Sequence, residues 1–360
     1  NLQKRLNDSL IENYICLFFL MKIYTNFMWV LKHLYKFSLR YILLILLLLV
    51  IYVYMRLKSL NIENFEAFNT ETRNTIIESK SPKKIAFCFL IYDEINHMDL
   101  WEKFFEGVDH SKYNIYIHYK SNRSLGNFNK YKLSRCVDTK WADKSLVKAS
   151  NLLFTTAFKK DSNNYKFVLL SNSCIPLKSF DYVYDFLTKD NKGYLNSFEL
   201  ENCGYYCKSK FNQAYPHYLA KCSQWVILNR LLVERVASVD DEIIDQWFSD
   251  IWAPDEMFYY SFIKLNKLEN QVVVSKFKAD GATTFIYWNG MNYKYKDPKH
   301  EASNKVKTSV LKNYSVLDKE ELDYLVDSKS LFGRKFNKDC IVVLDNNRKT
   351  HIKNYLSKFI

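Results

Sequence analysis

The stretch "YKFVLLSNSCIPL", residues 165–177, passes from an apolar run into a polar turn. The run "YKFVLL" (165–170) is typical of a short strand that is buried on both faces. Two earlier runs, "IAFCFLI" (85–91) and "YNIYIHY" (113–119), have the same character and also end in polar residues, as does the later "TTFIYW" (283–288). In an open α/β sheet, ligands bind beyond the carboxyl ends of the strands. We therefore expect the four polar ends, "IYDE", "HYKS", "SNSC" and "YWNG", to mark a binding edge.

Segments with helical periodicity alternate with these runs. The segment 145–160, "SLVKASNLLFTTAFKK", places apolar side chains on one helix face. A further strand is expected at "SQWVILNR" (223–230). The other expected helices are "MDLWEKFFEGV" (98–108), "FDYVYDFL" (180–187), "LLVERVAS" (231–238) and "PDEMFYYSFIKL" (254–265), the last with proline at its first position. This alternation predicts an α/β fold with a mainly parallel central sheet.

Composition excludes several classes of site. The 360 residues are 48% hydrophobic, enough for a large core, but include only seven glycines. Neither a G-x-G-x-x-G motif nor a P-loop is present, so a Rossmann dinucleotide site is not expected. The net charge of +13 suits an anionic partner or reflects a Lys-, Asn-, Ile- and Tyr-rich composition. A nucleic-acid binder is disfavoured, because no helix-turn-helix or RNP motif occurs.

The eight cysteines form no C-x-x-C pair. Cys88 and Cys174 lie in apolar runs and are expected in the core, whereas Cys203, Cys207 and Cys222 are candidates for a disulfide in an oxidising lumen. The sequence has no Asp-x-Asp motif and no H-x-x-x-H pair. A metal site is therefore not predicted.

Residues 41–55, "YILLILLLLVIYVYM", carry no charge. Extension over 37–56 gives a segment long enough for a membrane span, with Lys32, Lys36 and Arg40 around its start. This pattern predicts a type II signal anchor with a cytoplasmic tail over 1–36. A signal peptide and a buried core helix are the alternatives.

Met21 and Met28 are natural starts just before this anchor, so residues 1–20 belong to the tail or to an upstream extension. The polar, patternless residues 57–83 are interpreted as a stem. Residues 84–360 are expected to form a single domain.

Three sets of side chains suggest chemistry. Asp255 and Glu256 favour the first turn of a helix, but an ionised carboxylate there also accepts a proton from a hydroxyl. Arg334 and Lys335, in "SLFGRKFNK" (330–338), either form a solvated face or neutralise a departing diphosphate. Trp288 is either half-buried or stacks on a sugar ring.

With these residues in order, the chain resembles the core-2/I-branching β-1,6-N-acetylglucosaminyltransferase family. This family includes the peptide O-xylosyltransferases and plant core-2/I-branching-like proteins. The resemblance spans about Lys84 to Phe336, and "LLSNSCIPL" followed by "PDE" carries most of it. It implies a GT-A-like domain, inversion at the anomeric carbon, a UDP-sugar donor and no metal or other cofactor.

The resemblance also implies roles for individual residues. Glu256 corresponds to the catalytic base. Ile91, Tyr92 and Asp93 correspond to the segment that holds the nucleotide base. Lys335 corresponds to a cation on the diphosphate. Lys312 falls, by spacing, where the animal enzymes carry an arginine for the diphosphate, and Arg334 shares or replaces that role as the alternative. Trp288, Glu199 and Lys210 correspond to the acceptor site.

Lys120 stands where the animal enzymes carry an Asp, and the loop around Cys203–Cys222 is shorter than theirs. One nucleotide contact and the acceptor are therefore not transferable. The expected function is transfer of a sugar, with GlcNAc favoured, from a UDP-sugar to a glycan or glycoprotein. The expected location is a Golgi or ER membrane, or a host membrane if the protein is viral. The alternatives are a xylosyltransferase-like activity and a non-catalytic glycan-binding protein on the same fold.

Overall fold

The computed structural model describes residues 20–26, 44–53, 82–198, 200, 204–276, 283–287 and 311–360. The chain divides into two compact units, Asn1–Lys80 and Ser81–Ile360. In the first unit, residues 20–26 and 44–53 are helical. Among the described residues, no helix has both the length and the apolar character needed to cross a membrane. The expected anchor over 37–56 lies only partly within them and stays a prediction.

A seven-stranded sheet forms the centre of the second unit, with the order β2-β1-β3-β7-β5-β6 and β8 beside β5. Its strands are β1 (Lys84–Ile91), β2 (Tyr113–Tyr119), β3 (Asn164–Ser171), β5 (Gly193–Phe198), β6 (Lys221–Cys222), β7 (Ile227–Asn229) and β8 (Val272–Lys276). β1 is parallel to both β2 and β3, and β8 is parallel to β5, whereas β7 and β6 are antiparallel to their neighbours. The predicted α/β class is therefore confirmed, with the parallel strands gathered mostly at one side.

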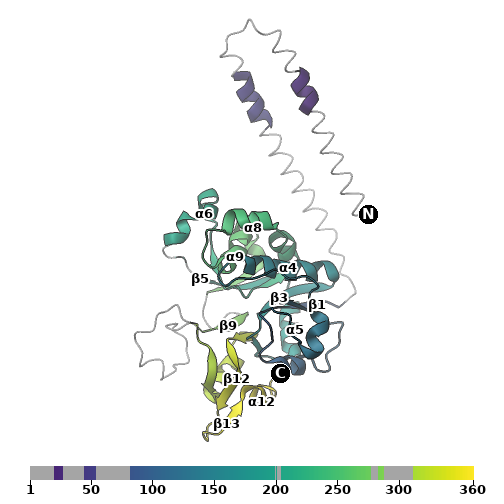
Figure 1. Cartoon of the computed structure of the whole chain (residues 1–360), viewed down its shortest axis with the longest axis vertical. Coiled ribbons are helices and arrows are strands. Elements are labelled where there is room, and N and C mark those ends of the chain that lie inside the picture. The colour runs from purple at the N-terminus through teal and green to yellow at the C-terminus, as the bar shows by residue number, and fades with distance from the viewer. Residues whose placement is uncertain are drawn as a thin grey trace. The chain divides into compact units, whose positions relative to one another are not determined.

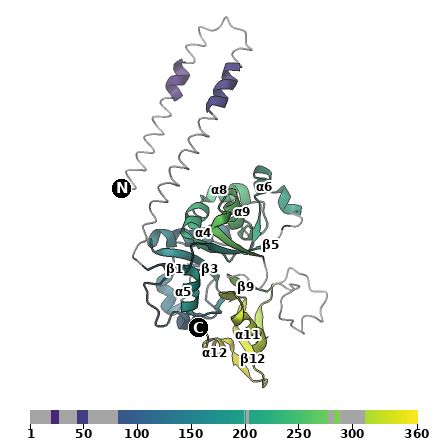
Figure 2. The same ribbon diagram turned by 180° about the vertical axis from the view of Figure 1, so that it is seen from behind.

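Helices cover both faces of this sheet (Figures 1 and 2). On one face lie α4 (Ser145–Lys160), α8 (Asp241–Phe248) and α9 (Phe258–Leu265), and on the other lie α3 (Met98–Phe105) and α5 (Phe180–Thr188). β1 shows why its sequence is apolar throughout. Ala86 and Cys88 pack into the first layer, whereas Phe87 and Phe89 pack into the second.

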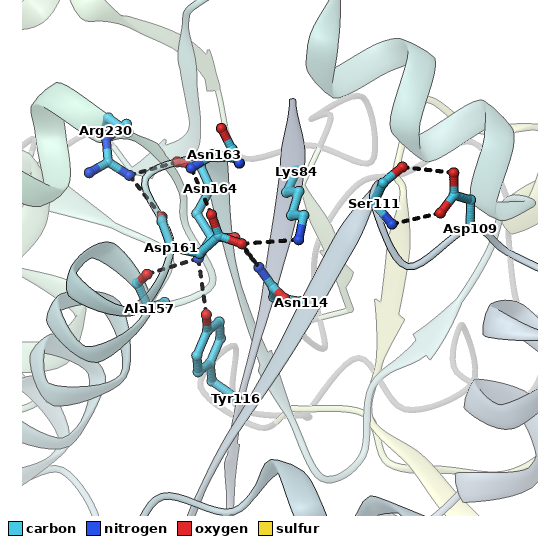
Figure 3. A network of polar contacts seen from close by, with 10 residues as sticks. All are labelled: Lys84, Asp109, Ser111, Asn114, Tyr116, Ala157, Asp161, Asn163, Asn164 and Arg230. Atoms are coloured by element: carbon cyan, nitrogen blue, oxygen red, sulfur yellow. Dashed lines mark hydrogen bonds and ion pairs between the residues drawn. The ribbon is translucent and has the colours of Figure 1, made fainter. Parts of the chain in front are cut away.

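Polar contacts fasten the amino ends of the three parallel strands (Figure 3). Lys84 Nζ of β1 lies 3.0 Å from Asp161 Oδ2, and Asn114 of β2 donates to the same oxygen at 2.9 Å. Arg230 donates to the carbonyls of Asp161 and Asn164, both at 3.2 Å. Burial acts to raise the pKa of Asp161, but hydrogen bonds from Asn114 and from the N–H of Asn163, together with Lys84, outweigh burial and lower it. These contacts all lie at the amino edge of the sheet. The opposite edge, at the carboxyl ends of the strands, therefore remains for other functions.

The C-terminal segment builds two small sheets beside the central one. In the first, β11 (Phe332–Arg334) lies between β4 (Ile175–Pro176) and β9 (Thr284–Ile286). The second has the order β10-β12-β13 and packs with α11 and α12 around its own apolar cluster. Its elements are β10 (Tyr314–Asp318), α11 (Lys319–Asp327), β12 (Phe336–Val343), β13 (Lys349–His351) and α12 (Ile352–Leu356).

Predictions for two segments and for Cys222 are wrong, whereas Cys207, another candidate for a disulfide, does form one. The strand expected over 223–230 is only Ile227–Asn229, and the helix after it is α7 (Arg230–Leu232) followed by a π-helical turn (Val233–Ala237). The helix expected over 254–265 is divided into a 3₁₀ turn, η4 (Pro254–Glu256), and α9. Cys222 is a buried free thiol, whereas Cys207 is disulfide-bonded. The core positions of Cys88 and Cys174 are confirmed.

Candidate active site

The carboxyl ends of β1, β2 and β3 meet, as the strand pattern predicts. The backbone N–H groups of Lys120 and Ser121, after β2, donate to the carbonyl of Tyr92 at 2.9 and 2.7 Å. The N–H of Asn96 donates to the carbonyl of Asn172, after β3, at 2.9 Å. Backbone bonds therefore hold the three polar ends together at one edge of the sheet.

The predicted nucleotide segment runs along this edge. Ile91 is buried in the core, so only its backbone faces the edge. Tyr92 is 59% exposed, and Lys120 Nζ lies 5.9 Å from the centroid of its ring. Asp93 Oδ2 lies 3.3 Å from Arg123 Nε. Tyr92 therefore offers a ring for stacking, whereas Asp93 is engaged with an arginine that the sequence pattern did not single out.

β11 carries Arg334 to the same edge. Phe332 and Gly333 pair with Pro176 and Ile175 of the "SNSCIPL" segment, and the N–H of Phe336 donates to the carbonyl of Ser173 at 3.1 Å. A Cβ at Gly333 would lie 3.1 Å from the Phe336 ring and 3.3 Å from Leu177 Cδ1, closer than ordinary packing allows. The polar turn after β3 therefore pairs with β11 and fixes the position of Arg334.

Glu256 ends the 3₁₀ turn η4. Ala253, just before the turn, has a left-handed backbone with φ 50° and ψ 60°, and its carbonyl accepts the N–H of Glu256 at 3.0 Å. Pro254 and Asp255 are buried, whereas Glu256 is about one-fifth exposed. The turn therefore leaves the carboxylate of Glu256 partly exposed to solvent and buries the carboxylate of the preceding residue, Asp255.

Four charged groups interact around this turn. Glu256 Oε2 lies 3.1 Å from Lys221 Nζ, on β6. The charges of both Asp255 and Glu256 act on Arg334, whose guanidinium stacks 4.2 Å from the centre of the Trp225 ring. Burial lowers the pKa of Arg334 to about 10, so the side chain stays cationic at neutral pH. The structure therefore brings two of the predicted residues, Glu256 and Arg334, to one site.

The remaining predicted residues have different surroundings. Lys335 is half-buried, and its pKa is lowered by burial and by the adjacent charge of Arg334. Lys312 Nζ forms a buried ion pair with Glu321 Oε1 at 3.0 Å, so its charge is already compensated. The backbone N–H of Lys210 binds Asp250 Oδ2 at 2.9 Å. Glu199 and Trp288 lie outside the described residues.

Residues 85–323 match the family described as Core-2/I-Branching enzyme. The chain belongs to the Core-2/I-branching enzyme family. The predicted family is thereby confirmed. The matched region includes Glu256 but ends before Arg334 and Lys335.

One curated relative matches a part of this Core-2/I-branching chain. The chain is 27% identical over 172 residues to the glycosyltransferase BC10 of Oryza sativa subsp. japonica. The match covers 46% of this chain and 42% of the rice protein. The chain thus spans less than half the length of this relative.

Two charged residues of the site were not among the predicted ones. Lys221 lies two positions before "SQW", and the sequence pattern there predicted only a strand. Asp255 was noted at a helix start, yet it is only 7% exposed, and its Oδ1 has no hydrogen-bond partner among the described residues. Burial and the charge of Glu256 raise the pKa of Asp255 to about 7. The only feature of the sequence that pointed to Lys221 was its position close to "SQW".

The raised pKa of Asp255 predicts a pH-dependent stability. Between its ordinary value of 3.8 and about 7, the unfolded chain loses a proton that the folded chain keeps. The free energy of unfolding therefore falls as pH rises through this window, by at most about 4 kcal/mol. We expect Asp255→Asn to unfold at a higher denaturant concentration than wild type at pH 8, with the difference largely lost at pH 4.5.

Asp339→Asn, an exposed site on β12, serves as the control and should keep the wild-type pH dependence. The measurement is denaturant unfolding at a series of pH values. An equal pH dependence in Asp255→Asn and wild type would contradict this account of Asp255.

Proposed function

We infer that this chain is an inverting glycosyltransferase that moves a sugar from a UDP-sugar to a hydroxyl of a glycan or glycoprotein. GlcNAc is the favoured sugar, and xylose is the alternative. The observation that carries this proposal is the presence of an arginine, Arg334, within electrostatic range of the carboxylate of Glu256. Family membership and the sheet topology support a GT-A-like domain for residues 84–360.

In the proposed mechanism, Glu256 accepts the proton of the acceptor hydroxyl. The hydroxyl oxygen attacks C1 of the donor sugar, and the bond between C1 and the diphosphate oxygen breaks from the opposite side. The configuration at C1 is therefore inverted. The electron pair of the broken bond leaves with UDP, whose added negative charge Arg334 and Lys335 neutralise.

The contacts of Glu256 support its role as a base. The ammonium of Lys221 forms an ion pair with Glu256 Oε2 at 3.1 Å, which fixes the position of the carboxylate. Partial exposure of Glu256 leaves it accessible to an incoming hydroxyl. Asp255 does not serve this role in the proposal, because it is buried beneath the turn.

The positions of Tyr92 and Asp93 support a nucleotide site at the carboxyl edge of β1. In the proposal, the uracil stacks on the exposed Tyr92 ring and hydrogen-bonds to the adjacent segment, including the backbone of Ile91. Trp288, Glu199 and Lys210 are assigned to the acceptor on the resemblance alone. We also propose that residues 37–56 anchor the domain in a Golgi or ER membrane, or in a host membrane if the protein is viral.

The decisive experiment is a donor screen on the full chain. Hydrolysis of UDP-GlcNAc, UDP-xylose, UDP-galactose and UDP-glucose is measured by UDP release, first without an acceptor. We expect release from one donor well above the others, with UDP-GlcNAc favoured. Absence of release from every UDP-sugar, together with no binding of UDP by calorimetry, would overturn the proposal.

Transfer is expected to be fully active in EDTA, because Arg334 and Lys335 supply the positive charge that a divalent ion provides in other glycosyltransferases. Among the described residues, no three His, Cys, Asp or Glu side chains are placed to share a metal ion. The measurement compares initial rates in EDTA, in Mg²⁺ and in Mn²⁺. A rate in EDTA below about one-tenth of the rate in Mn²⁺ would contradict the prediction.

A further inference from the structure

Asn96 connects separate segments of the candidate site. It lies in the loop between β1 and α3, three positions after Asp93. Its backbone N–H donates to the carbonyl of Asn172, in the polar turn after β3, at 2.9 Å. Its side-chain Nδ2 donates to the carbonyl of Phe336, at the start of β12, at 3.1 Å. Asn96 therefore bridges the predicted nucleotide segment, the turn after β3 and the strand that follows Lys335.

The backbone next to Lys335 is held at three successive groups. The carbonyl of Lys335 accepts the N–H of Tyr314 at 2.7 Å, and the N–H of Phe336 donates to the carbonyl of Ser173 at 3.1 Å. The next group along the chain, the carbonyl of Phe336, accepts the side chain of Asn96. Of these three bonds, only the last uses a side chain. A substitution of Asn96 therefore removes one bond and leaves the other two in place.

The loop that carries Asn96 is itself fixed. Ile95 and His97, on either side of it, are both buried. The carbonyl of His97 accepts the N–H groups of Leu100 and Trp101 at 3.1 and 3.2 Å, so the loop continues directly into the first turn of α3. A hydrogen bond from a side chain on such a supported segment holds its partner in one position.

A second contact joins the same loop to β12, but it is weaker. Glu94 Oε2 lies 3.1 Å from Lys338 Nζ, and the two side chains are 42% and 61% exposed. An ion pair between exposed side chains contributes little, because water screens it. The half-buried amide of Asn96 is therefore the main side-chain connection that we consider between the two segments.

We propose that Asn96 is a positioning residue that sets the place of the diphosphate cations relative to the nucleoside contacts. This inference rests on the proposed function, in which the loop after β1 holds the uracil and Lys335, with Arg334, meets the diphosphate. The two contacts act on one ligand, so each counts fully only when the other is correctly placed. Asn96 acts through the backbone beside Lys335, and its role needs no contact with the ligand.

The test compares uridine with UDP as ligands of the full chain. Uridine reaches only the nucleoside contacts, whereas UDP also reaches the cations. In Asn96→Ala, we expect uridine affinity within about twofold of wild type and UDP affinity lower by about tenfold, because the diphosphate then meets displaced cations. The value of kcat/KM for sugar transfer should fall by at least the same factor. Uridine binding is measured by ligand-observed NMR and UDP binding by calorimetry.

Asn96→Asp provides a second variant with the same side-chain shape. It replaces the donor with an oxygen that faces the carbonyl oxygen of Phe336, so UDP affinity should fall at least as far as in the alanine variant. Asn266→Ala is the matched control, because Asn266 Nδ2 also donates to a backbone carbonyl, that of Phe262, at 2.8 Å. Asn266 lies at the opposite end of α9 from the Glu256 turn, and both affinities should stay at their wild-type values.

A double-mutant cycle with Lys335→Ala tests whether Asn96 acts through the cation. In the Lys335→Ala background, Asn96→Ala should cost less than about threefold in UDP affinity, because a contact that it positions is already gone. An asparagine with a merely structural role would cost the same factor in both backgrounds. Equal costs would therefore overturn the inference.

Two further results in folded variants would also overturn it. One is UDP affinity within about twofold of wild type in both Asn96 variants, measured against the loss expected for a hydrogen bond. The other is a loss of uridine and UDP affinity by the same factor, which would mean that the whole loop is distorted. A wild-type chain that binds neither uridine nor UDP would instead refute the proposed function, and the role of Asn96 with it.

Discussion

Glu256→Gln is expected to lower kcat for sugar transfer by about 10²- to 10⁴-fold, the contribution typical of a positioned general base. Glutamine has nearly the same shape as glutamate but does not take up the proton of the acceptor hydroxyl. The affinity for UDP should stay the same or rise slightly, because the change removes a negative charge near Arg334. The measurements are steady-state transfer kinetics and calorimetric titration with UDP.

Glu242→Gln provides the matched control, because Glu242 is an exposed glutamate at the start of α8. It makes the same chemical change outside the site and should transfer sugar at the wild-type rate. A Glu256→Gln chain that keeps more than one-tenth of wild-type kcat would remove Glu256 from the mechanism.

Arg334→Lys is expected to lower kcat/KM by about 10²- to 10³-fold, comparable with the loss of one preorganised donor to a developing charge. Lysine retains the positive charge but lacks the planar fork that binds two phosphate oxygens and stacks on the Trp225 ring. UDP affinity should fall by about tenfold. The effect on UDP separates this variant from Glu256→Gln, in which chemistry is lost and binding is kept.

Arg348→Lys, in the exposed turn between β12 and β13, is the control for the same substitution. Thermal unfolding of both variants distinguishes loss of a ligand contact from loss of packing around Arg334. Transfer kinetics and UDP affinity within threefold of wild type in a folded Arg334→Lys chain would contradict the assigned role.

The parallel strands were predictable because both of their faces are buried. A continuous apolar run such as 85–91 leaves little choice of conformation, and β1 begins only one residue earlier than expected. The helix over 254–265 was wrong for a reason invisible in its residue types. Met257 lies between the Pro-Asp-Glu turn and α9, and its φ of -114° is far from the α-helical value, so the two pieces do not form one continuous α-helix. A methionine within a helical pattern does not predict that geometry.

The residues of the candidate site also divide into those that the sequence predicted and those that it did not. Motif order pointed to Glu256, Arg334 and Lys335, since these side chains belong to short segments with recognisable neighbours. Lys221 escaped because a single lysine carries no pattern, and its importance comes from a 3.1 Å contact across the fold. Lys312 was placed by spacing alone, and spacing did not reveal that Glu321 neutralises it in the core.

The insertion of β11 between β4 and β9 has a consequence for how the protein is made. β4 is synthesised early and β9 much later, and Arg334 follows both of them in the chain. A nascent chain on the ribosome therefore carries Glu256 well before Arg334. A product that terminates between residues 257 and 333 would possess the carboxylate without the arginine, so under the proposed mechanism it would lack a cation for the departing diphosphate.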